Sequence, residues 1–357
     1  MDYILITLTA FVITLLATPI TINLAKKFGL VDNPKLRPHP AHVQNRIVPR
    51  AGGVPIFSGL LIASLIFLPL DKHLTGILAG ALILLIIGLI DDKKPNFNPY
   101  LRLILLFGAA GVAVASGIGI SFIANPLANF NLPILGSSQF IQLDQIIIPF
   151  NILGPHRIIL LADIFAFIWI VVLMQIINWS KGVDGQMPGI TSVAALTLAF
   201  LSLKLYFNGD INQLNVARLA FISAGVSLGF LVFNWYPAKI FPGFSGSTIL
   251  AFMLATLSIL SGAKVATALL VLGVPAADFI YTFFRRIAQG HSPVWGDRAH
   301  LHHRLLDLGW SHRKISLFYI FGSAILGSVA LLSNTESKFF VGIIVLLAFL
   351  GFIKKYG

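Results

Sequence analysis

Four short polar breaks in a very apolar sequence carry side chains that suit phosphate or metal chemistry. The first contains two adjacent carboxylates, Asp91 and Asp92, followed directly by two lysines. Magnesium usually takes one or two protein carboxylates and fills its other positions with phosphate and water. This pair therefore suits a hard divalent cation, although a solvated helix end would show the same residues.

The second break, 178–188, presents an amide and a carboxylate on a glycine turn. Asn178 is followed by Lys181-Gly-Val-Asp-Gly185, so the carboxylate is Asp184, and Pro188 starts the next apolar run. A nucleotide or a metal ion would use these residue types, whereas a plain connection between two helices needs none of them. An ordinary polar loop is the remaining alternative.

The third break, Gly243-Phe-Ser-Gly-Ser247, opens a predicted helix. The first N–H groups of a helix have no partner inside it, and the helix dipole adds partial positive charge, so such an end attracts phosphate. No Gly-Lys-Ser/Thr sequence occurs here, which excludes a Walker loop. A glycine turn alone is a weak signal, and a simple helix start is the alternative.

The fourth break, 285–314, is basic and contains His300-Leu-His-His303 between arginines, among them Arg285. A run of this kind can bind zinc, but the chain has no cysteine and few carboxylates lie nearby. A cationic, hydrogen-bonding pocket for a diphosphate or a nucleobase fits these residues better. Histidines without a role in a basic loop are the alternative.

The elements that hold these breaks must be membrane helices. Hydrophobic residues make up 57% of the 357 residues and charged residues only 11%, whereas soluble domains carry about 25% charge. One helix needs about 20 apolar residues to cross a bilayer core. Such runs occur at 3–25, 51–70, 74–90, 100–120, 158–178, 189–207, 212–234, 247–262, 264–284, 315–332 and 338–354. The sequence thus predicts an all-α integral membrane protein, with one polytopic domain over 1–357 and about eleven transmembrane helices.

Lysine and arginine positions predict the orientation in the membrane. If the runs cross in turn, nineteen of the 25 basic residues fall on the side that carries all four breaks. The positive-inside rule then places the N-terminus outside and the C-terminus and the four breaks in the cytoplasm. Topology and anionic lipid also explain the net charge of +12 better than nucleic acid does. The connection at 121–157 is expected to form a small hairpin at the outer surface.

A series of ordered motifs makes the chain resemble the bacterial polyprenyl-phosphate N-acetylhexosamine-1-phosphate transferases of the WecA/TagO-like group. They are Phe28-Gly-Leu-Val-Asp32, Pro49-Arg-Ala-Gly-Gly53, Gly88-Leu-Ile-Asp-Asp92, Asn178 with Gly182-Val-Asp-Gly185, Asn234 with Pro237-Ala-Lys-Ile-Phe241 and Gly246-Ser247, Gly273-Val-Pro275 with Asp278 and Arg285-Arg286, and His300-Leu-His-His-Arg-Leu305. The last motif is similar to the sugar-lipid branch and not to the branch that transfers phospho-MurNAc-pentapeptide.

The resemblance implies transfer of a sugar 1-phosphate from a UDP-N-acetylhexosamine to undecaprenyl phosphate, with release of UMP. Magnesium, or manganese in its place, would assist at the cytoplasmic face of the bacterial inner membrane, in the first step of cell-envelope glycan assembly. Asp91 and Asp92 would carry catalysis and, with Asp184, bind the metal ion. The residues implied in substrate binding are Asn178, Lys181, Asp184, Asn234, Ser247, Arg285, His300, His302 and His303.

Two positions depart from the family pattern. Lys181 stands where the family usually has an aspartate, and Phe244 stands where it usually has a metal-binding aspartate. Three carboxylates remain, which is enough for magnesium with phosphates, and Lys181 could itself neutralise a diphosphate oxygen. The departures leave open a non-catalytic homologue that binds carrier lipid or nucleotide sugar.

A transporter is a further alternative, which the positions of the charges disfavour. Ion-coupled transporters place charged groups near the middle of the bilayer. Here only Asp163 and Asp278 lie deep in apolar runs, and neither is central. Asp278 is expected to support the site from below, and Asp163 to be structural. The sequence does not decide whether the protein forms a homodimer.

Overall fold

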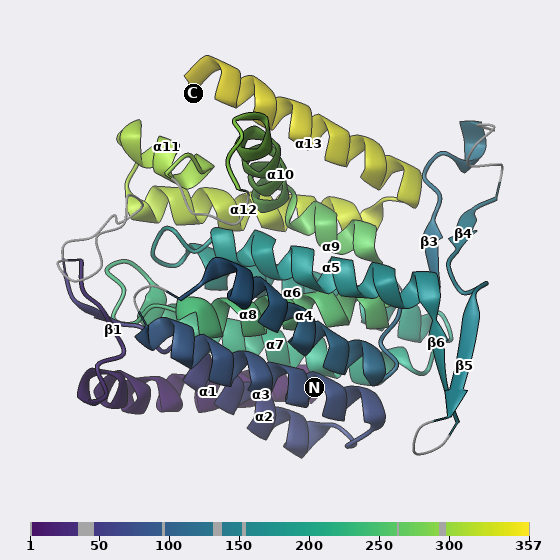
Figure 1. Cartoon of the computed structure of the whole chain (residues 1–357), viewed down its shortest axis with the longest axis horizontal. Coiled ribbons are helices and arrows are strands. Elements are labelled where there is room, and N and C mark those ends of the chain that lie inside the picture. The colour runs from purple at the N-terminus through teal and green to yellow at the C-terminus, as the bar shows by residue number, and fades with distance from the viewer. Residues whose placement is uncertain are drawn as a thin grey trace.

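The computed structural model describes residues 2–34, 46–94, 97–130, 138–151, 155–262, 264–292 and 298–356. Most helices of this part lie side by side along one direction (Figure 1). Their bounds are α1 Asp2–Lys27, α2 Gly53–Phe67, α3 Lys72–Lys93, α4 Pro99–Ala115, α5 Leu160–Trp179, α6 Gln186–Phe207, α7 Gln213–Asn234, α8 Gly243–Leu260, α9 Val265–Val271, α10 Gly273–Ala288, α11 Leu301–Asp307, α12 His312–Leu332 and α13 Thr335–Tyr356.

The prediction of an all-helical membrane protein is confirmed, with fewer full spans than the eleven apolar runs. In the part of the chain that the structure describes, eight helices are long and apolar enough to cross a membrane, and a bent pair raises this number to nine. The eight are α1, α3, α5, α6, α7, α8, α12 and α13. Two further runs form the shorter apolar helices α2 and α4. Each predicted run therefore contains a helix, but not every run yields a helix of full membrane length.

The run at 264–284 forms two helices instead of the single predicted one. Between α9 and α10 the chain bends by 89°, and α10 lies across the direction of the long helices (Figure 1). Pro275 lies in the first turn of α10, and a proline has no N–H to continue a preceding helix. The motif Gly273-Val-Pro275 thus marks the bend.

Polar side chains fix several helix starts. Asp71 accepts a hydrogen bond from the Leu74 amide (2.7 Å) at α3, and Asn98 accepts one from the Tyr100 amide (2.8 Å) at α4. Asp163 accepts one from the Ile159 amide (2.9 Å) at the start of α5, which agrees with the structural role expected for it. Such caps satisfy N–H groups that have no partner within the helix.

The helix α8 lies at the centre of the molecule. Of the 18-residue apolar stretch of α8, 94% is buried inside the protein, whereas only 11% of the corresponding stretch of α13 is buried. Its first turn is packed closely by α2 and α3, because a Cβ atom at Gly53 or Gly88 would overlap Ser245. The N-terminus of α8 is therefore held rigidly between two neighbouring helices.

Short antiparallel strand pairs lie at both ends of the helix bundle (Figure 1). At one end, β3 (Phe122–Ala124) pairs with β4 (Phe140–Gln142), and β5 (Ile147–Asn151) pairs with β6 (Pro155–Ile159). They fall in the connection where a hairpin was predicted between α4 and α5. At the opposite end, β1 (Val31–Asp32) pairs with β2 (Val48–Pro49), which the sequence analysis did not predict.

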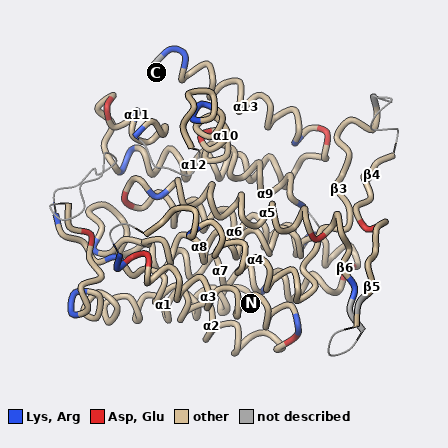
Figure 2. The backbone as a smooth tube through the Cα atoms, viewed as in Figure 1, with Lys and Arg blue, Asp and Glu red and all other residues tan. Residues whose placement is uncertain are grey.

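Charged residues gather towards the two ends of the bundle and are sparse between them (Figure 2). The end that carries β1 and α11 also holds the carboxyl end of α3 and the break after α5. This end is the place where the predicted site residues meet.

Candidate functional site

The site begins at Asp92, in the last turn of α3, which caps the N-terminus of α8. Its carboxylate accepts hydrogen bonds from the Phe244 amide (2.7 Å), the Ser245 amide (3.3 Å) and the Ser245 hydroxyl (2.8 Å). Gly243 has a φ of 67°, and a Cβ atom on it would overlap this carboxylate. The N–H groups that the sequence offered to phosphate are thus bound by Asp92.

Each carboxylate predicted to bind a metal ion is paired with an arginine. The pairs are Asp91 with Arg102 Nε (2.9 Å), Asp92 with Arg50 Nε (3.0 Å) and Asp184 with Arg46 Nη2 (3.1 Å). The guanidinium of Arg50 also lies 3.8 Å from Asp32. Sequence reasoning missed these three arginines, although Arg50 lies inside a quoted motif and Arg102 lies at the start of an apolar run.

Lys181 lies against the N-terminus of α8 from the other side. Its Nζ donates hydrogen bonds to Asn178 Oδ1 (2.6 Å), the Gly243 carbonyl (3.0 Å) and Ser247 Oγ (3.3 Å). Burial, and next the charge of Arg50, lowers the pKa of the Lys181 ammonium to about 7. The structure therefore brings together three of the predicted substrate-binding residues, from α5, the turn and α8.

Two cations lie over the ring of Phe244. The Arg102 guanidinium carbon is 4.9 Å from its centroid and Lys181 Nζ is 5.6 Å from it, both within the range of a cation–π interaction. The two positions that depart from the family pattern are thus in contact with each other.

The other half of the turn is anchored to the segment after α7. Asp184 accepts a hydrogen bond from the Ala238 amide (2.9 Å), and Asn234 Oδ1 accepts one from the Gly185 amide (3.0 Å). The Asn234 side-chain amide in turn donates to the Ile240 carbonyl (2.9 Å). In this arrangement Asn234 positions the turn, and its predicted contact with substrate stays a prediction.

The histidine cluster packs onto the same turn. A Cβ atom at Gly182 would overlap the His302 ring, so only glycine allows this approach. Asp278 fixes the start of α11, because it lies 3.0 Å from His300 Nδ1 and accepts a hydrogen bond from the Leu301 amide (2.9 Å). This is the support from below that was expected of Asp278.

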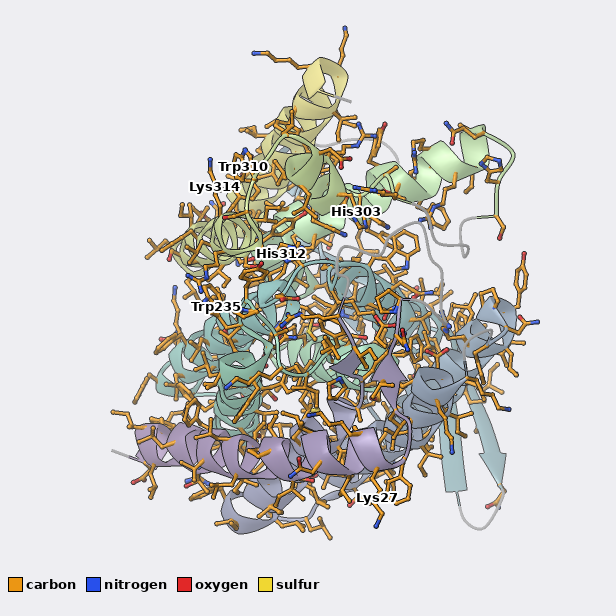
Figure 3. All side chains as sticks on the ribbon, turned by 90° about the vertical axis from the view of Figure 1, so that its left-hand side faces the viewer. Lys27, Trp235, His303, Trp310, His312 and Lys314 are labelled. Carbon is orange, nitrogen blue, oxygen red and sulfur yellow. The ribbon has the colours of Figure 1, made fainter. Side chains whose placement is uncertain are left out.

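Two of the histidines are uncharged at neutral pH. Burial, followed by neighbouring histidines, lowers the pKa of His302 well below its usual value, and burial and His300 lower the pKa of His303 to about 4. The Nδ1 atoms of both rings are buried without a hydrogen-bond partner in the described part of the chain. Figure 3 looks onto this end and labels His303, His312 and Trp235 there. These histidines can serve a ligand by hydrogen bonds and not by charge.

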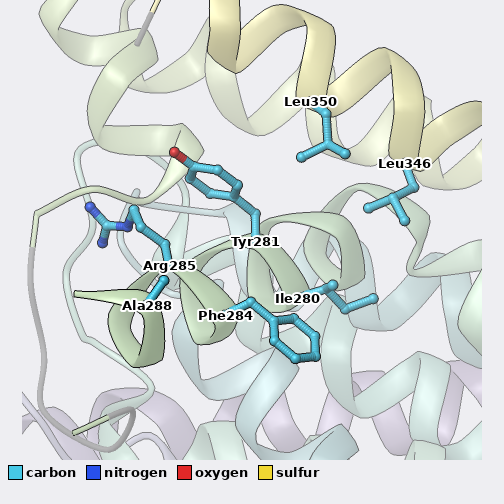
Figure 4. Close-up of a pocket in the computed structure, with 7 residues that line it drawn as sticks. All are labelled: Ile280, Tyr281, Phe284, Arg285, Ala288, Leu346 and Leu350. Carbon is cyan, nitrogen blue, oxygen red and sulfur yellow. The ribbon is translucent and has the colours of Figure 1, made fainter. Parts of the chain in front are cut away.

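An apolar groove separates α10 from α13 (Figure 4). The groove has a volume of about 450 Å³. Its lining consists of Ile280, Tyr281, Phe284, Arg285, Ala288, Leu346 and Leu350. Arg285 therefore lies at this groove, with its guanidinium carbon 6.0 Å from the Tyr281 ring, and its predicted contact with substrate stays a prediction.

The carboxylates predicted to bind magnesium are all engaged by arginines, which disfavours a metal ion held by them. Among the described residues, no group of three or more His, Asp or Glu side chains is close enough to hold a metal ion. Asp91, Asp92 and Asp184 are each paired with an arginine, and the Lys181 ammonium lies at the N-terminus of α8. The magnesium or manganese implied by the resemblance stays a prediction.

Comparison with known proteins agrees with the resemblance. Residues 74–262 match the family described as Glycosyl transferase family 4. The chain belongs to this family. The membership covers α3 to α8, and so includes the acidic pair, the glycine turn and the N-terminus of α8.

Several curated relatives extend the similarity over nearly the whole chain. A probable undecaprenyl-phosphate N-acetylglucosaminyl 1-phosphate transferase of Bacillus subtilis is 31% identical, over 88% of this chain and 81% of its own. A decaprenyl-phosphate N-acetylglucosaminephosphotransferase of Mycolicibacterium smegmatis is 32% identical, over 88% and 78%. An undecaprenyl-phosphate alpha-N-acetylglucosaminyl 1-phosphate transferase of Escherichia coli K12 is 26% identical, over 94% and 84%. Its similarity to these relatives shows that this member of family 4 is a sugar-phosphate transferase.

Proposed function

We propose that this protein transfers a sugar 1-phosphate, N-acetylhexosamine 1-phosphate, from a UDP-sugar to undecaprenyl phosphate and releases UMP. The observation that carries the proposal is the gathering of Lys181, Arg102 and Arg50 around the N-terminus of α8. Both substrates are phosphate esters, and a site for them must neutralise several negative charges. The relatives named above act on polyprenyl phosphates and N-acetylglucosamine 1-phosphate.

The transfer itself needs little covalent help from the protein. An oxygen of the lipid phosphate attacks the sugar-bearing phosphorus of the donor and forms a new P–O bond. The bond from that phosphorus to the bridging oxygen breaks, and UMP leaves with this oxygen and its electron pair. A phosphate monoester has a second pKa near 6, so the acceptor is mostly a dianion at pH 7 without a base. Catalysis then depends on positioning and charge neutralisation.

The arginines of the site are suited to hold the transferring phosphates. Arg102 and Arg50 are fixed by Asp91 and Asp92, and their side chains remain 30% and 24% exposed. An arginine has five N–H donors, so a carboxylate partner leaves others for phosphate. In this proposal Asp91 and Asp92 act as positioning residues for the two guanidinium groups.

The groove between α10 and α13 would hold the acceptor's hydrocarbon tail. It is apolar along its length and bears Arg285, so a long isoprenoid could lie in it with its phosphate towards the polar end of the bundle. The uncharged histidines His302 and His303, with unpaired Nδ1 atoms, would bind the donor's sugar or base by hydrogen bonds.

The site would face the cytoplasm of a bacterial inner membrane. The proposal follows from the basic residues at the end of the bundle that carries β1 and α11 (Figure 2), because cytoplasmic loops of membrane proteins carry excess lysine and arginine. Nucleotide sugars are made in the cytoplasm, so this side also supplies the donor. The product would be the first lipid-linked intermediate of a cell-envelope glycan.

The direct test is release of UMP by the purified protein in detergent or nanodiscs. The protein is incubated with undecaprenyl phosphate and a panel of UDP-sugars, with magnesium, with manganese and with EDTA. UMP release that needs both the lipid and one donor supports the proposal. No UMP with any donor under any of these conditions would instead favour the non-catalytic homologue.

A further inference from the structure

The Lys181 ammonium is a partly buried cation whose hydrogen-bond partners are all uncharged. It donates to an amide oxygen of Asn178, the carbonyl of Gly243 and the hydroxyl of Ser247. In the part of the chain described by the structure, no ion pair joins it to a carboxylate. Asp91 and Asp92 pair with arginines and act on Lys181 through their charge alone, which raises its pKa. A buried charge without a directly bound counter-charge is costly.

Two arginines, Arg50 and Arg102, lie close enough to this ammonium to lower its pKa, against the opposite effect of Asp92 and Asp91. The ammonium lies at the positive end of the α8 dipole, and Arg102 lies over the same Phe244 ring. The pKa of Lys181 falls to about 7 because burial, and then Arg50, penalise its charged form. An anion placed beside Lys181 and Arg102 would relieve both penalties, so the site is arranged to receive one.

The same geometry disfavours a divalent cation at this point. Phe244 offers a ring and no oxygen, and the nearest carboxylates already bind guanidinium groups. Magnesium requires oxygen ligands at close distances, and the ammonium would repel it. The two positions at which the family usually has aspartate therefore supply an ammonium and an aromatic ring in place of two carboxylates.

We infer that Lys181, together with Arg102 across the Phe244 ring, replaces a divalent cation and neutralises the donor's diphosphate, so that donor binding and transfer proceed without metal. The inference rests on the proposed function and specifies how its site handles charge. The bonds formed and broken in the transfer are unchanged. The diphosphate oxygens would take the place of one or more of the uncharged acceptors of Lys181.

The test is binding of UDP to the purified full chain, measured by calorimetry in EDTA and in excess magnesium. We expect the same Kd in both buffers. Lys181→Met keeps the length of the side chain without its charge and should weaken UDP binding about ten- to hundredfold, the cost of one charge-assisted hydrogen bond. Lys181→Arg should keep metal-independent binding.

Lys204→Met is the matched control, because Lys204 is exposed at the far end of α6, where its ammonium donates to the Leu331 carbonyl. This variant should bind UDP like the wild type. If Lys181→Met does not fold, as judged by its melting curve, UDP binding by the wild-type protein in the two buffers still tests whether binding needs a metal ion.

UMP release measured in the same two buffers separates this inference from the proposed function. If UDP binding or UMP release requires magnesium, the inference is wrong and the proposed function still stands. The same holds if Lys181→Met binds UDP normally. Failure to bind UDP in either buffer also contradicts the inference. Metal-free binding that depends on Lys181, without UMP release from any donor, would support the cation site and contradict the transferase.

Discussion

Three arginines hold the carboxylates that the sequence presents as metal ligands. These ion pairs change the roles of Asp91 and Asp92, because both oxygens of Asp92 accept hydrogen bonds from the protein and Asp91 binds Arg102 through two guanidinium nitrogens. In the proposed reaction the carboxylates would orient the groups that face phosphate. Among the described residues, the site consists of ion pairs between carboxylates and arginines, beside which the Lys181 ammonium donates to uncharged acceptors.

Arg102→Met should lower kcat/KM for UMP release about a hundredfold or more, the usual loss when one group that stabilises transition-state charge is removed. The variant also leaves Asp91 without its partner, which adds negative charge beside the phosphates. Steady-state kinetics measure the loss. Arg218→Met is the control, since Arg218 lies on α7 and, among the described residues, its side chain donates a hydrogen bond to Asn215 (3.4 Å). An equal loss in both variants would contradict a specific role for Arg102.

The stability of the ligand-free protein should depend on Lys181 above neutral pH. The pKa of this lysine is about 7 in the folded protein, against about 10.5 for an unperturbed lysine, so between these values the unfolded chain binds more protons. Stability then rises with pH across this window. Arg50, Arg102, Asp91 and Asp92 set the shift together with burial.

Melting temperatures at pH 7 and pH 9 test this dependence. The wild type should gain stability relative to Lys181→Met as pH rises. Parallel pH curves for the two proteins would show that the lysine is not held in a penalised charged state.

At the scale of elements, the N-terminus of α8 organises the site. Gly53 and Gly88 allow α2 and α3 to reach Ser245, and Asp92 caps the helix from α3. The strand residue Pro49 accepts a hydrogen bond from the Phe241 amide (2.8 Å) just before α8. The rigid site is thus built from segments far apart in the sequence.

Gly243→Ala should destabilise the protein and reduce transfer. Its positive φ alone costs a non-glycine residue about 1–2 kcal/mol, and the new Cβ atom would overlap the Asp92 carboxylate. The matched control is Gly209→Ala, because Gly209 has a φ of 104° and open space around its Cβ position. A fall in melting temperature no greater than that of the control would argue against the cap by Asp92.

Hydropathy predicted most elements correctly because long apolar runs have one stable form in lipid. It did not predict the bend between α9 and α10, close to Pro275, within a single predicted run. The ion pairs between arginines and carboxylates could not be predicted from the sequence for a different reason. Arg46 and Asp184, for example, are 138 residues apart, and only the fold brings them together. Lys181 and Phe244 were recognised as departures, but their mutual contact needed coordinates.

At the scale of the whole molecule, the proposal places the nucleotide sugar at the polar end and the lipid tail in the apolar groove. The convergence of Asp92, the glycine turn and the histidines at one end was predicted from the sequence, and the contacts of Lys181 with α8 and of His302 with Gly182 confirm that these segments meet. The groove between α10 and α13 follows from the bend that hydropathy missed.

Leu346→Trp should fill part of this groove and raise KM for undecaprenyl phosphate about tenfold, because the tail would lose apolar contact area. KM for the UDP-sugar should not change. Leu347→Trp is the matched control, since Leu347 is the next residue, is 61% exposed and does not line the groove. Equal effects of the two variants on the lipid KM would place the tail elsewhere.

The central claim, transfer of a sugar together with its phosphate, is tested most directly with a donor that carries radioactive phosphorus next to the sugar. The purified protein is incubated with this donor and undecaprenyl phosphate, and the lipid and aqueous phases are separated. The account predicts that the label moves into the lipid and that unlabelled UMP appears in water. Labelled UDP in the aqueous phase, with sugar alone in the lipid, would contradict it.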